Sequence, residues 1–473
     1  MLAVLGGAAG LLLAIWGVPV LAGLAPQDIE QARAATIDAQ VMMFALGISL
    51  LTALLFGLVP ALQATKPNLN ESLKAGGTGL SANSGGRMRS LLVVSEIALA
   101  MVLLIGGGLL LRSFARLSNV NPGYRTSQLL TLEVFPSYGK YNDTTKRAAF
   151  YDELLQRVQA LPGVEAAAVV TALPAKSNLL EMTWITEQRE RPKVISAVPL
   201  SASAGYFQTL AMPLVAGRTF DQRDLPNTDG VIVINEAMAK AAWPADNPLG
   251  KRMKMGVMTN PWLTVVGVIK NTRLRLEMTP APQVYLSYAQ TPAFGPGDLV
   301  LQTKSEPTSL AAAVRREVWV IDKDQPVAEI RTMESLLDES IERPRFNTLL
   351  IAIFGSLAML LAVIGIFGVM SYTVTQNRRD IGLRMALGAQ ASDVLKLVIK
   401  QGMSLVLVGI TLGVLAALTL TKVMTTLLFD VTATDPLTFA GMAVLFVAVA
   451  FLACYLPARR ANCINPLEVM RND

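Results

Sequence analysis

The sequence predicts an α-helical membrane protein that carries a large α+β domain outside the membrane. Of its 473 residues, 52% are hydrophobic and only 16% are charged, whereas soluble domains carry about 25% charged residues. A membrane-spanning helix needs about 20 mostly apolar residues. Six stretches qualify: 1–24, 41–60, 91–111, 349–372, 403–428 and 437–456. The mixed segment between the third and fourth stretches is long enough to form a core of its own.

The basic residues predict which side of the membrane each loop faces. Three segments beside the spans are rich in Lys and Arg: 66–89, 373–402 and 456–471. Six spans place all three on one side, and the excess of basic residues identifies that side as the cytoplasm. Both termini are then cytoplasmic and residues 112–348 lie outside. Because topology accounts for much of the net charge of +6, we expect no nucleic-acid partner.

Residues 1–77 repeat the end of the chain. When Pro60 is placed over Pro457 without gaps, Asp38 falls on Asp435, and the register holds through the span and the tail that follows it. We therefore expect an internal duplication whose first copy lacks its first span and external domain, so that Met1 reads as a truncated start. A signal peptide is the alternative for the N-terminus, but the segment lacks a basic beginning and its apolar run is too long.

Residues 78–90, rich in Gly, Ser and Asn, are predicted to be a flexible cytoplasmic linker. Neither the linker nor the rest of the chain contains a GxxxxGK[ST] phosphate loop, so the chain is not an ATPase of the P-loop class. The span at 91–111 contains Glu96, and a carboxylate in a membrane is a candidate functional group. We expect Glu96 to pack against a neighbouring helix or reach the interface; a proton relay is the alternative.

The external segment, residues 112–348, is predicted to contain two βαβ units. In the first, strands at 129–135 and 164–171 flank a helix at 146–161 with Phe150, Leu154 and Val158 on one face. In the second, strands at 299–303 and 326–330 flank a helix at 309–321. Together they predict a split α+β sandwich. An insertion of about 197–290, with strands at 231–234 and 264–269, predicts a smaller β-rich subdomain, and Thr332 is placed to cap a helix that leads to the next span.

The loop at 373–402 contains a short helix signal over residues 379–387. Asp380 lies in its expected first turn and Gly388 follows as a stop. The residues that we select as a candidate partner-binding helix are Arg378, Arg379, Asp380, Ile381, Arg384, Met385, Leu387 and Gly388. Positions four apart stack on a helix, so the apolar members form rows beside the arginines. A basic loop that only sets the topology explains the same composition, and composition does not separate the two.

Five runs of sequence resemble one family, the FtsX-like permeases of ABC transporters of the MacB type. Two runs, RRDIGLRMALGA (378–389) and LPARRANCINPLEVMR (456–471), are similar to the permease part of this family. The MacB-like periplasmic core domain is similar to YFQTLAMPLVAGRTF (206–220), VIVINEAMAKAAWPADNPLGKR (231–252) and WLTVVGVIKNTR (262–273). The duplication resembles the tandem, ADOP-like branch of duplicated orphan permeases.

This resemblance implies a mechanism and a set of partners. Residues 1–77 would be the C-terminal half of a first permease unit, residues 349–473 a second permease domain, the split sandwich a porter subdomain and the insertion a Sabre subdomain. Residues 378–389 would be the coupling helix that contacts a separate cytoplasmic ABC ATPase, which would bind ATP, so that the chain itself needs no cofactor. The chain would lie in the bacterial inner membrane, as a homodimer or with a missing N-terminal half, with a periplasmic or outer-membrane partner.

Two functions follow from the resemblance. The first is a permease subunit that exports an amphiphile, a peptide or a lipoprotein. The alternative is a non-transporting signalling subunit that regulates a periplasmic partner such as a cell-wall hydrolase. A membrane enzyme has little support, because the chain has no histidine, no cysteine in its external segment and no convergent carboxylate motif. Asp221 and Asp224 are expected to be solvated turn residues and not a catalytic pair.

Overall fold

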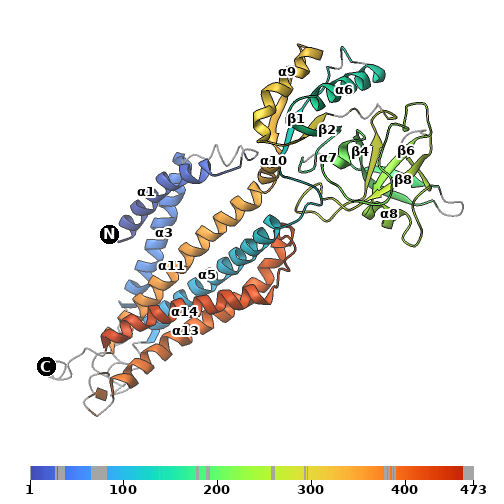
Figure 1. The fold of residues 1–473 in the computed structure, drawn as a ribbon. Coiled ribbons are helices and arrows are strands. Elements are labelled where there is room, and N and C mark those ends of the chain that lie inside the picture. The colour runs from blue at the N-terminus through green and yellow to red at the C-terminus, as the bar shows by residue number, and fades with distance from the viewer. Residues whose placement is uncertain are drawn as a thin grey trace. The chain divides into compact units, whose positions relative to one another are not determined.

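A computed structural model gives the fold of the chain (Figure 1). The structure describes residues 2–26, 29, 38–64, 83–137, 139–141, 143–176, 180–187, 192–256, 261–291, 295, 297–377, 381, 384–385, 387 and 390–461, without the side chains of 2–4, 52–64, 83–88, 144, 391 and 460–461. The chain divides into two compact units. The helical unit is Met1–Arg116 with Arg343–Asp473, and the external unit is Leu117–Glu342.

The helical unit is built from long apolar helices. These are α1 (Leu2–Gly23), α3 (Ala39–Ala64), α5 (Asn83–Ser118), α11 (Glu342–Gln376), α13 (Ala391–Leu420), the 3-10 helix η2 (Thr421–Leu427) and α14 (Pro436–Ala461). Five of the helices in the described part of the chain are long and apolar enough to cross a membrane: α1, α5, α11, α13 with η2, and α14. The sixth predicted span, 41–60, lies within α3, whose side chains are described only as far as Leu51.

Helix α5 corrects the prediction of a flexible linker at 78–90. Residues 78–82 lie outside the described residues, but α5 already begins at Asn83 and runs for 36 residues to Ser118. Adding a residue to an existing helix is far easier than starting one, so the apolar helix extends into the Gly- and Ser-containing segment before it. At 1.5 Å per residue, α5 is about 54 Å long, well beyond the roughly 30 Å of a bilayer core.

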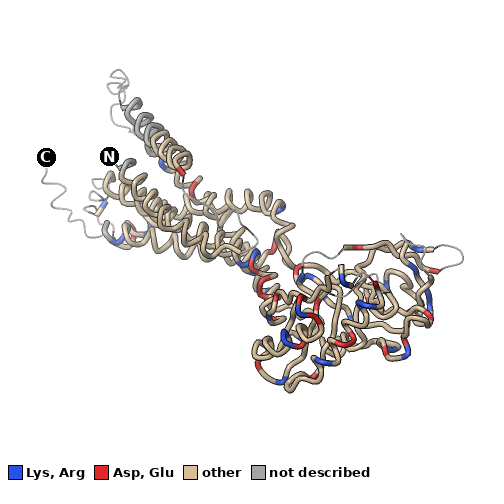
Figure 2. The backbone as a smooth tube through the Cα atoms, turned by 90° about the horizontal axis from the view of Figure 1, so that it is seen from above, with Lys and Arg blue, Asp and Glu red and all other residues tan. Residues whose placement is uncertain are grey.

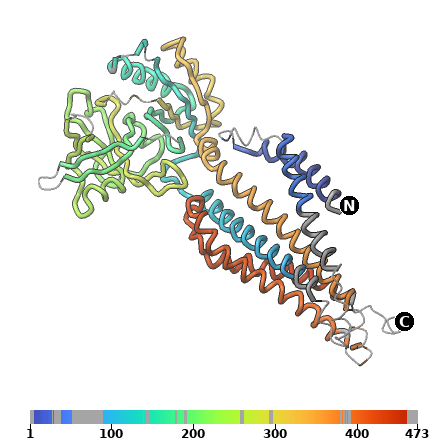
Figure 3. The backbone as a smooth tube through the Cα atoms, turned by 180° about the vertical axis from the view of Figure 1, so that it is seen from behind, coloured from blue at the N-terminus to red at the C-terminus, as the bar shows by residue number. Residues whose placement is uncertain are grey.

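Glycines bring the helices around α5 into close contact (Figures 1 and 3). A Cβ atom on Gly413 of α13 would lie 2.6 Å from Cβ of Met101 and 2.9 Å from the carbonyl oxygen of Ala98, both on α5. On α5 itself, a Cβ at Gly107 would meet Ile351 of α11 at 3.4 Å, and one at Gly108 would meet Met442 of α14 at 2.6 Å. Small residues let helices approach in lipid, where dispersion contacts drive association. Helix α5 therefore contacts α11, α13 and α14.

The two copies of the predicted repeat begin their second helix in the same way. Asp38 accepts a hydrogen bond from the backbone N–H of Val41 at the start of α3, at 2.8 Å. Asp435 accepts one from the N–H of Thr438 at the start of α14, at 3.0 Å. Both aspartates act as N-caps three residues before the donor, which is a standard way to satisfy the first free N–H groups of a helix. The two caps lie at positions that the alignment of Pro60 with Pro457 pairs, and the internal repeat itself stays a prediction.

The external unit is organised around an 11-stranded sheet with the order β11-β1-β10-β2-β4-β3-β7-β8-β6-β9, in which β5 pairs with β8. The strands are β1 (Leu129–Glu133), β2 (Val164–Val170), β3 (Met182–Thr186), β4 (Val194–Ala202), β5 (Leu214–Gly217), β6 (Val231–Asn235), β7 (Arg252–Met255), β8 (Leu263–Ile269), β9 (Gln283–Ser287), β10 (Asp298–Thr303) and β11 (Ala328–Thr332). The helices are α6 (Thr144–Gln159), α7 (Tyr206–Thr209), α8 (Glu236–Ala242), η1 (Pro307–Leu310), α9 (Ala311–Ile321) and α10 (Met333–Ser340).

The two βαβ units interlock. Strand β10 lies between β1 and β2, and β1 lies between β10 and β11, all in antiparallel pairs. Helices α6 and α9 cover one face, where Phe150, Leu154 and Val158 are buried as their spacing predicts. The other face packs a second core that includes Tyr206, Tyr285, Met333 and Leu336. Thr332 caps α10 by accepting a hydrogen bond from the N–H of Ser335 at 3.1 Å.

The inserted region contains more strands than the sequence predicts. Strands β6 and β8 lie where the sequence predicts them, but β5, β7 and β9 within the predicted insertion, and β3 and β4 before or at its start, were not predicted. Strand β9 is buried at every position and β5 has four residues, so neither shows the alternation that identifies a half-buried strand. Strand β4 pairs with β2 and with β9, which joins the insertion to the two βαβ units in one sheet.

Candidate coupling site

The candidate coupling segment lies between α11 and α13. Ile381 continues the helical pattern of α11, since its N–H donates to the carbonyl oxygen of Asn377 at 2.9 Å. Arg384 and Met385 are also helical, and Leu387 lies in a turn. Arg378, Arg379, Asp380 and Gly388 lie outside the described residues. The assignment of the whole segment as a coupling helix therefore stays a prediction.

The described apolar residues of this segment have two different environments. Ile381 is 3% exposed and belongs to the core of the helical unit together with Val394 and Val398 of α13, and Met385 packs against that core. Leu387, in contrast, is 86% exposed. The sequence places Ile381 with Met385 in one row, and this row holds the segment to the bundle. Among the apolar side chains that the structure describes in this segment, Leu387 is the exposed one.

Helix α13 begins directly after this segment with a well-formed cap. The side chain of Gln390 accepts a hydrogen bond from the backbone N–H of Asp393. The carboxylate of Asp393 in turn accepts one from the N–H of Gln390 at 3.2 Å. This reciprocal pair satisfies two N–H groups that would otherwise lack acceptors. The start of α13 is therefore fixed at Gln390 by its own first turn.

Glu96 lies against α11. A Cβ atom on Gly365 would be 2.6 Å from Oε2 of Glu96, so the carboxylate occupies the space that a side chain would fill. Seven residues earlier on the same helix, the guanidinium of Arg89 lies 4.1 Å from the ring centre of Tyr372, also on α11. Cations over aromatic faces are attracted by the ring quadrupole. The contacts favour packing of Glu96 between helices over a proton relay.

Arg112 and Arg116 have a role that the sequence did not indicate. They follow the predicted span at 91–111; Arg112 forms an ion pair with Asp435, and Arg116 binds the carbonyl oxygen and the carboxylate of Asp430. Between them, Ser113 accepts a hydrogen bond from the N–H of Phe429 at 2.7 Å. In the sequence, the one sign of a role for Asp435 is that it aligns with Asp38 in the predicted repeat. That alignment does not identify Arg112 as its partner.

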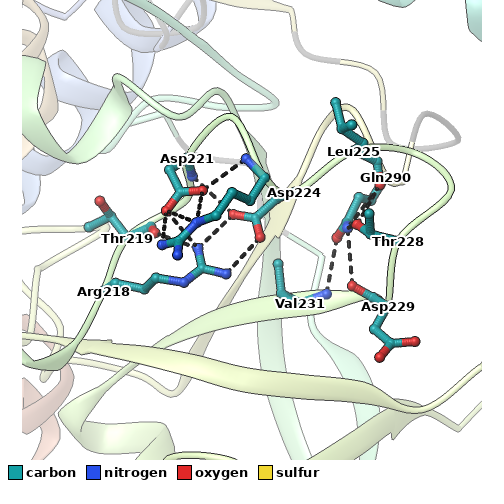
Figure 4. A network of polar contacts seen from close by, with 10 residues as sticks. Arg218, Thr219, Asp221, Asp224, Leu225, Thr228, Asp229, Val231 and Gln290 are labelled. Atoms are coloured by element: carbon teal, nitrogen blue, oxygen red, sulfur yellow. Dashed lines mark hydrogen bonds and ion pairs between the residues drawn. The ribbon is translucent and has the colours of Figure 1, made fainter.

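In the external unit, the prediction that Asp224 is a solvated turn residue is wrong. Its side chain is 4% exposed and receives two hydrogen bonds of 2.8 Å from Arg218 (Figure 4). The hydrogen bond from Arg218 holds the pKa of Asp224 below its ordinary value. Asp221 contacts Arg223, whose hydrogen bond likewise lowers the pKa of Asp221. Each carboxylate has an arginine partner, which fixes the loop between β5 and β6 and does not resemble a catalytic pair.

Gln290 closes the same loop from its other end. Its amide nitrogen donates to the hydroxyl of Thr228 at 3.0 Å and to the carbonyl oxygens of Leu225 and Asp229 at 3.2 Å (Figure 4). Its amide oxygen accepts from the N–H of Val231 at 3.0 Å. The Gln290 side chain therefore supplies hydrogen-bond partners for backbone carbonyl and N–H groups of this loop.

A second charged cluster joins strands of the βαβ units. Nζ of Lys176 lies 2.5 Å from Oδ1 of Asp298 and also contacts Glu133. Asp298 is 2% exposed and its other oxygen accepts from the N–H of Leu173 at 2.8 Å. Burial raises the pKa of Asp298, although Lys176 and the Leu173 N–H oppose the shift. Charges are spread through this unit, whereas the helices carry few along their length (Figure 2). No group of three or more Cys, Asp or Glu residues in the described ranges is arranged to hold a metal ion.

Comparison with known proteins matches both units. The model of the MacB-like periplasmic core domain matches residues 90–318, and that of the FtsX-like permease C-terminal domain matches residues 352–466. The macrolide export ATP-binding/permease protein MacB of Agrobacterium fabrum (strain C58) is 25% identical over 423 residues, which are 86% of this chain and 61% of that protein. MacB of Escherichia coli (strain K12) is 23% identical over 427 residues, 85% of this chain and 61% of that protein.

The chain thus spans about three-fifths of the length of these relatives, 61% in both cases. A solved structure, the periplasmic region of MacB from Actinobacillus actinomycetemcomitans, has 14% sequence identity and a TM-score of 0.34, and the match covers 48% of this chain and 98% of that one. Both domain types occur here in the order and at the positions that the sequence motifs indicate. The chain belongs to the MacB/FtsX-like permease family.

Proposed function

We propose that the chain is the permease subunit of an ABC transporter in a bacterial inner membrane. A separate cytoplasmic ATPase would bind the segment between α11 and α13, and its ATP-driven movement would shift the external unit in the periplasm. Both termini would be cytoplasmic. The interlocked βαβ units would serve as the porter-like part and the insertion as the Sabre-like part. Family membership supports the permease role, and the two environments of the coupling segment support the coupling.

The observation that carries the proposal is the difference between Ile381 and Leu387. Ile381 is 3% exposed and fixed in the bundle, while Leu387 is 86% exposed six residues later. A segment that receives a push needs one face attached to the helices that move and another face free for the partner. Exposed large apolar side chains next to basic residues are typical of protein interfaces. Arg384 is exposed beside Leu387 and supplies the basic residue.

The continuity of the helices offers a path for the movement. Helix α11 is a single helix of 35 residues, about 52 Å at 1.5 Å per residue, and it begins two residues after α10 ends. Helix α10 contributes Met333 and Leu336 to a buried core of the external unit, and Tyr124, six residues beyond α5, is in the same core. Both chain segments that enter and leave this unit are therefore anchored in one packed interior, which transmits displacement because it is close-packed.

For substrate, we propose an amphiphilic molecule taken up outside the membrane and exported from the periplasm. The relatives named above are macrolide export proteins, and macrolides are amphiphiles.

The test uses ATPase recruitment from native membranes. Tagged wild-type chain and the Leu387→Asp variant are purified in mild detergent, and vanadate-sensitive ATP hydrolysis is measured in each eluate. Placing a charge at an apolar contact costs about 1.4 kcal/mol or more, a tenfold loss, so the variant should retain less than about a tenth of the hydrolysis. Leu427→Asp, at an exposed leucine of η2 (55% exposed) beyond the other end of α13, is the matched control and should retain it. Equal hydrolysis in wild type and Leu387→Asp would refute the proposed contact.

A further inference from the structure

Three residues near the end of α5 hold the segment between η2 and α14. We name the contacts of Arg112, Ser113 and Arg116 with Phe429, Asp430 and Asp435 the outer clasp. Positions 112, 113 and 116 share one side of a helix because residues three and four apart are neighbours. Ser113 is 4% exposed, and its hydroxyl accepts the N–H of Phe429 at 2.7 Å. A backbone N–H in a connection between helices thus finds its acceptor on a different helix.

The clasp also fixes the conformation of the connection. Asp430 has φ of +50°, a left-handed conformation that non-glycine residues adopt only at a cost of about 1 kcal/mol. Arg116 binds both its carbonyl oxygen and its carboxylate, the latter at 3.2 Å. A strained backbone persists where its surroundings hold it. Arg116 therefore holds the turn in a shape that the connection would not favour alone.

Arg112 binds the carboxylate that starts α14. Oδ2 of Asp435 accepts from the backbone N–H and the hydroxyl of Thr438, at 3.0 Å and 2.6 Å, and from Arg112. These hydrogen bonds, first those from Thr438 and then that from Arg112, hold the pKa of Asp435 below its usual range. The carboxylate stays ionised at neutral pH, and α5 is bonded to the first turn of α14 through it. Elsewhere α5 also contacts α13 and α14 through glycines and apolar side chains, as at Gly108, Gly409 and Gly413.

These two kinds of contact resist displacement in different ways. Glycine contacts set how closely two helices approach, and the apolar side chains around them resist displacement through many individually weak dispersion contacts. Directed hydrogen bonds to one carboxylate and one carbonyl group oppose displacement along the helix axis, because their strength falls steeply with distance and angle. The clasp lies where α5 ends and the external unit begins, since that unit starts at Leu117.

We propose that the outer clasp is the coupling between the α13–α14 pair and α5, and that Arg112 and Arg116 are positioning residues for movement of the external unit. This inference rests on the proposed function for its purpose, because α13 begins at the candidate ATPase contact. A push on α13 would displace the connection at 428–435, and the clasp would carry that displacement to the end of α5. Without the clasp, α13 and α14 would move while α5 stayed.

The first experiment needs no nucleotide. Hydrogen–deuterium exchange is measured on the full chain in nanodiscs for wild type and for the double variant Arg112→Met, Arg116→Met, which keeps side-chain length without charge. Exchange should rise at least fivefold at Phe429 and across residues 114–124, while Cys454, 0% exposed in the bundle, stays unreactive to thiol reagent. Arg315→Met, Arg316→Met on α9 is the matched control and should leave 114–124 unchanged. Unaltered exchange at 114–124 in the clasp variant overturns the inference whether or not an ATPase binds.

The second experiment separates coupling from general stabilisation. In complexes purified with the native ATPase, the change in exchange that ATP with vanadate produces at residues 119–128 and 328–341 is compared among variants. The clasp variant should hydrolyse ATP within twofold of wild type but lose most of that change, and Arg112→Lys, Arg116→Lys should recover part of it. Hydrolysis that falls together with the movement would indicate a structural role only and overturn the inference. A wild-type complex without any nucleotide response would count against the proposed function, and the first experiment would still decide the clasp.

Discussion

The interior of each of the two units of this permease is stabilised by a different kind of contact. In the helical unit, α5 packs closely against glycines of its neighbours, such as Gly413 against Met101 and Ala98. In the external unit, buried charges hold strands and loops, as with Lys176 and Asp298 or Arg218 and Asp224. In lipid, apolar side chains gain little by leaving their solvent, so close fit of shape decides helix association. In water, a buried charge is costly unless paired, so a pair that is present fixes where its groups lie.

This difference predicts that the helical unit fails when volume is added and the external unit fails when a charge is lost. The chain contains native probes for each. Cys454 is buried among the helices, and after Cys463→Ser it is the only thiol in the chain. Four of the five tryptophans, at 184, 243, 262 and 319, lie in the external unit. Thiol labelling during heating reports on the first unit, and tryptophan fluorescence in denaturant reports largely on the second.

The largest effect is expected from Gly413→Val. A Cβ atom already meets a carbonyl oxygen of α5 at 2.9 Å, and backbone cannot move aside as a side chain can. Overpacking costs about 1–3 kcal/mol, so the midpoint for labelling of Cys454 should fall by about 5 °C or more, with the tryptophan transition unchanged. Gly441→Val in α14, where nothing lies within 4 Å of the added atom, is the control. Equal midpoints for the two variants would show that the glycine contact is not limiting.

Lys176→Met should produce the largest effect in the external unit. It leaves Asp298, 2% exposed, and Glu133 without their shared cation, and an unpaired buried charge costs about 3 kcal/mol. The denaturant midpoint of tryptophan fluorescence should fall while the thiol midpoint of Cys454 stays. Lys304→Met, at an exposed lysine of the same unit, should change the free energy of unfolding by less than about 0.5 kcal/mol. A thiol midpoint that fell equally would contradict the separation of the two units.

A smaller, pH-dependent effect is expected from Asp224→Asn. The pKa of Asp224 is lowered by Arg218, so the folded state binds its proton less tightly than the unfolded state, where the pKa is about 3.9. Its contribution is full above that value and is lost as the pH falls through the lower folded pKa. At pH 7 the variant should lose about 2 kcal/mol, and the difference from wild type should shrink as the pH falls below about 4. A difference that did not depend on pH would contradict the ion pair.

The smallest effect on folding is expected at Leu387→Asp. This side chain is 86% exposed, so both the thiol and the tryptophan transitions should stay within about 0.5 kcal/mol of wild type. Ile381→Asp, six residues before it in the same segment, places a charge in the bundle core and should lower the thiol midpoint strongly. If Leu387→Asp also lowered the thiol midpoint, Leu387 would stabilise the fold. A loss of ATPase recruitment in that variant could then not be assigned to a lost contact with the ATPase.

The sequence predicted those parts of the fold that depend on neighbours in the chain. The faces of α6 and α9, the cap at Thr332 and the strands β1, β2 and β10 were placed to within one to three residues, because each has its own apolar spacing or cap. The outer clasp was not predicted, since Arg112 and Asp435 are 323 residues apart and neither has a local motif. Asp224 was misjudged because its burial depends on Arg218 and on how the loop folds over β6.

The shared core of the external unit has a consequence for how force acts on it. Tyr124, just after α5, and Met333 and Leu336, just before α11, are buried together. If α5 and α11 moved by the same amount in the same direction, this core would be carried along without distortion. Under the proposed coupling, a shift of one helix against the other would instead strain the contacts among Tyr124, Met333 and Leu336. The external unit would then respond to the difference between the displacements of α5 and α11 and not to their sum.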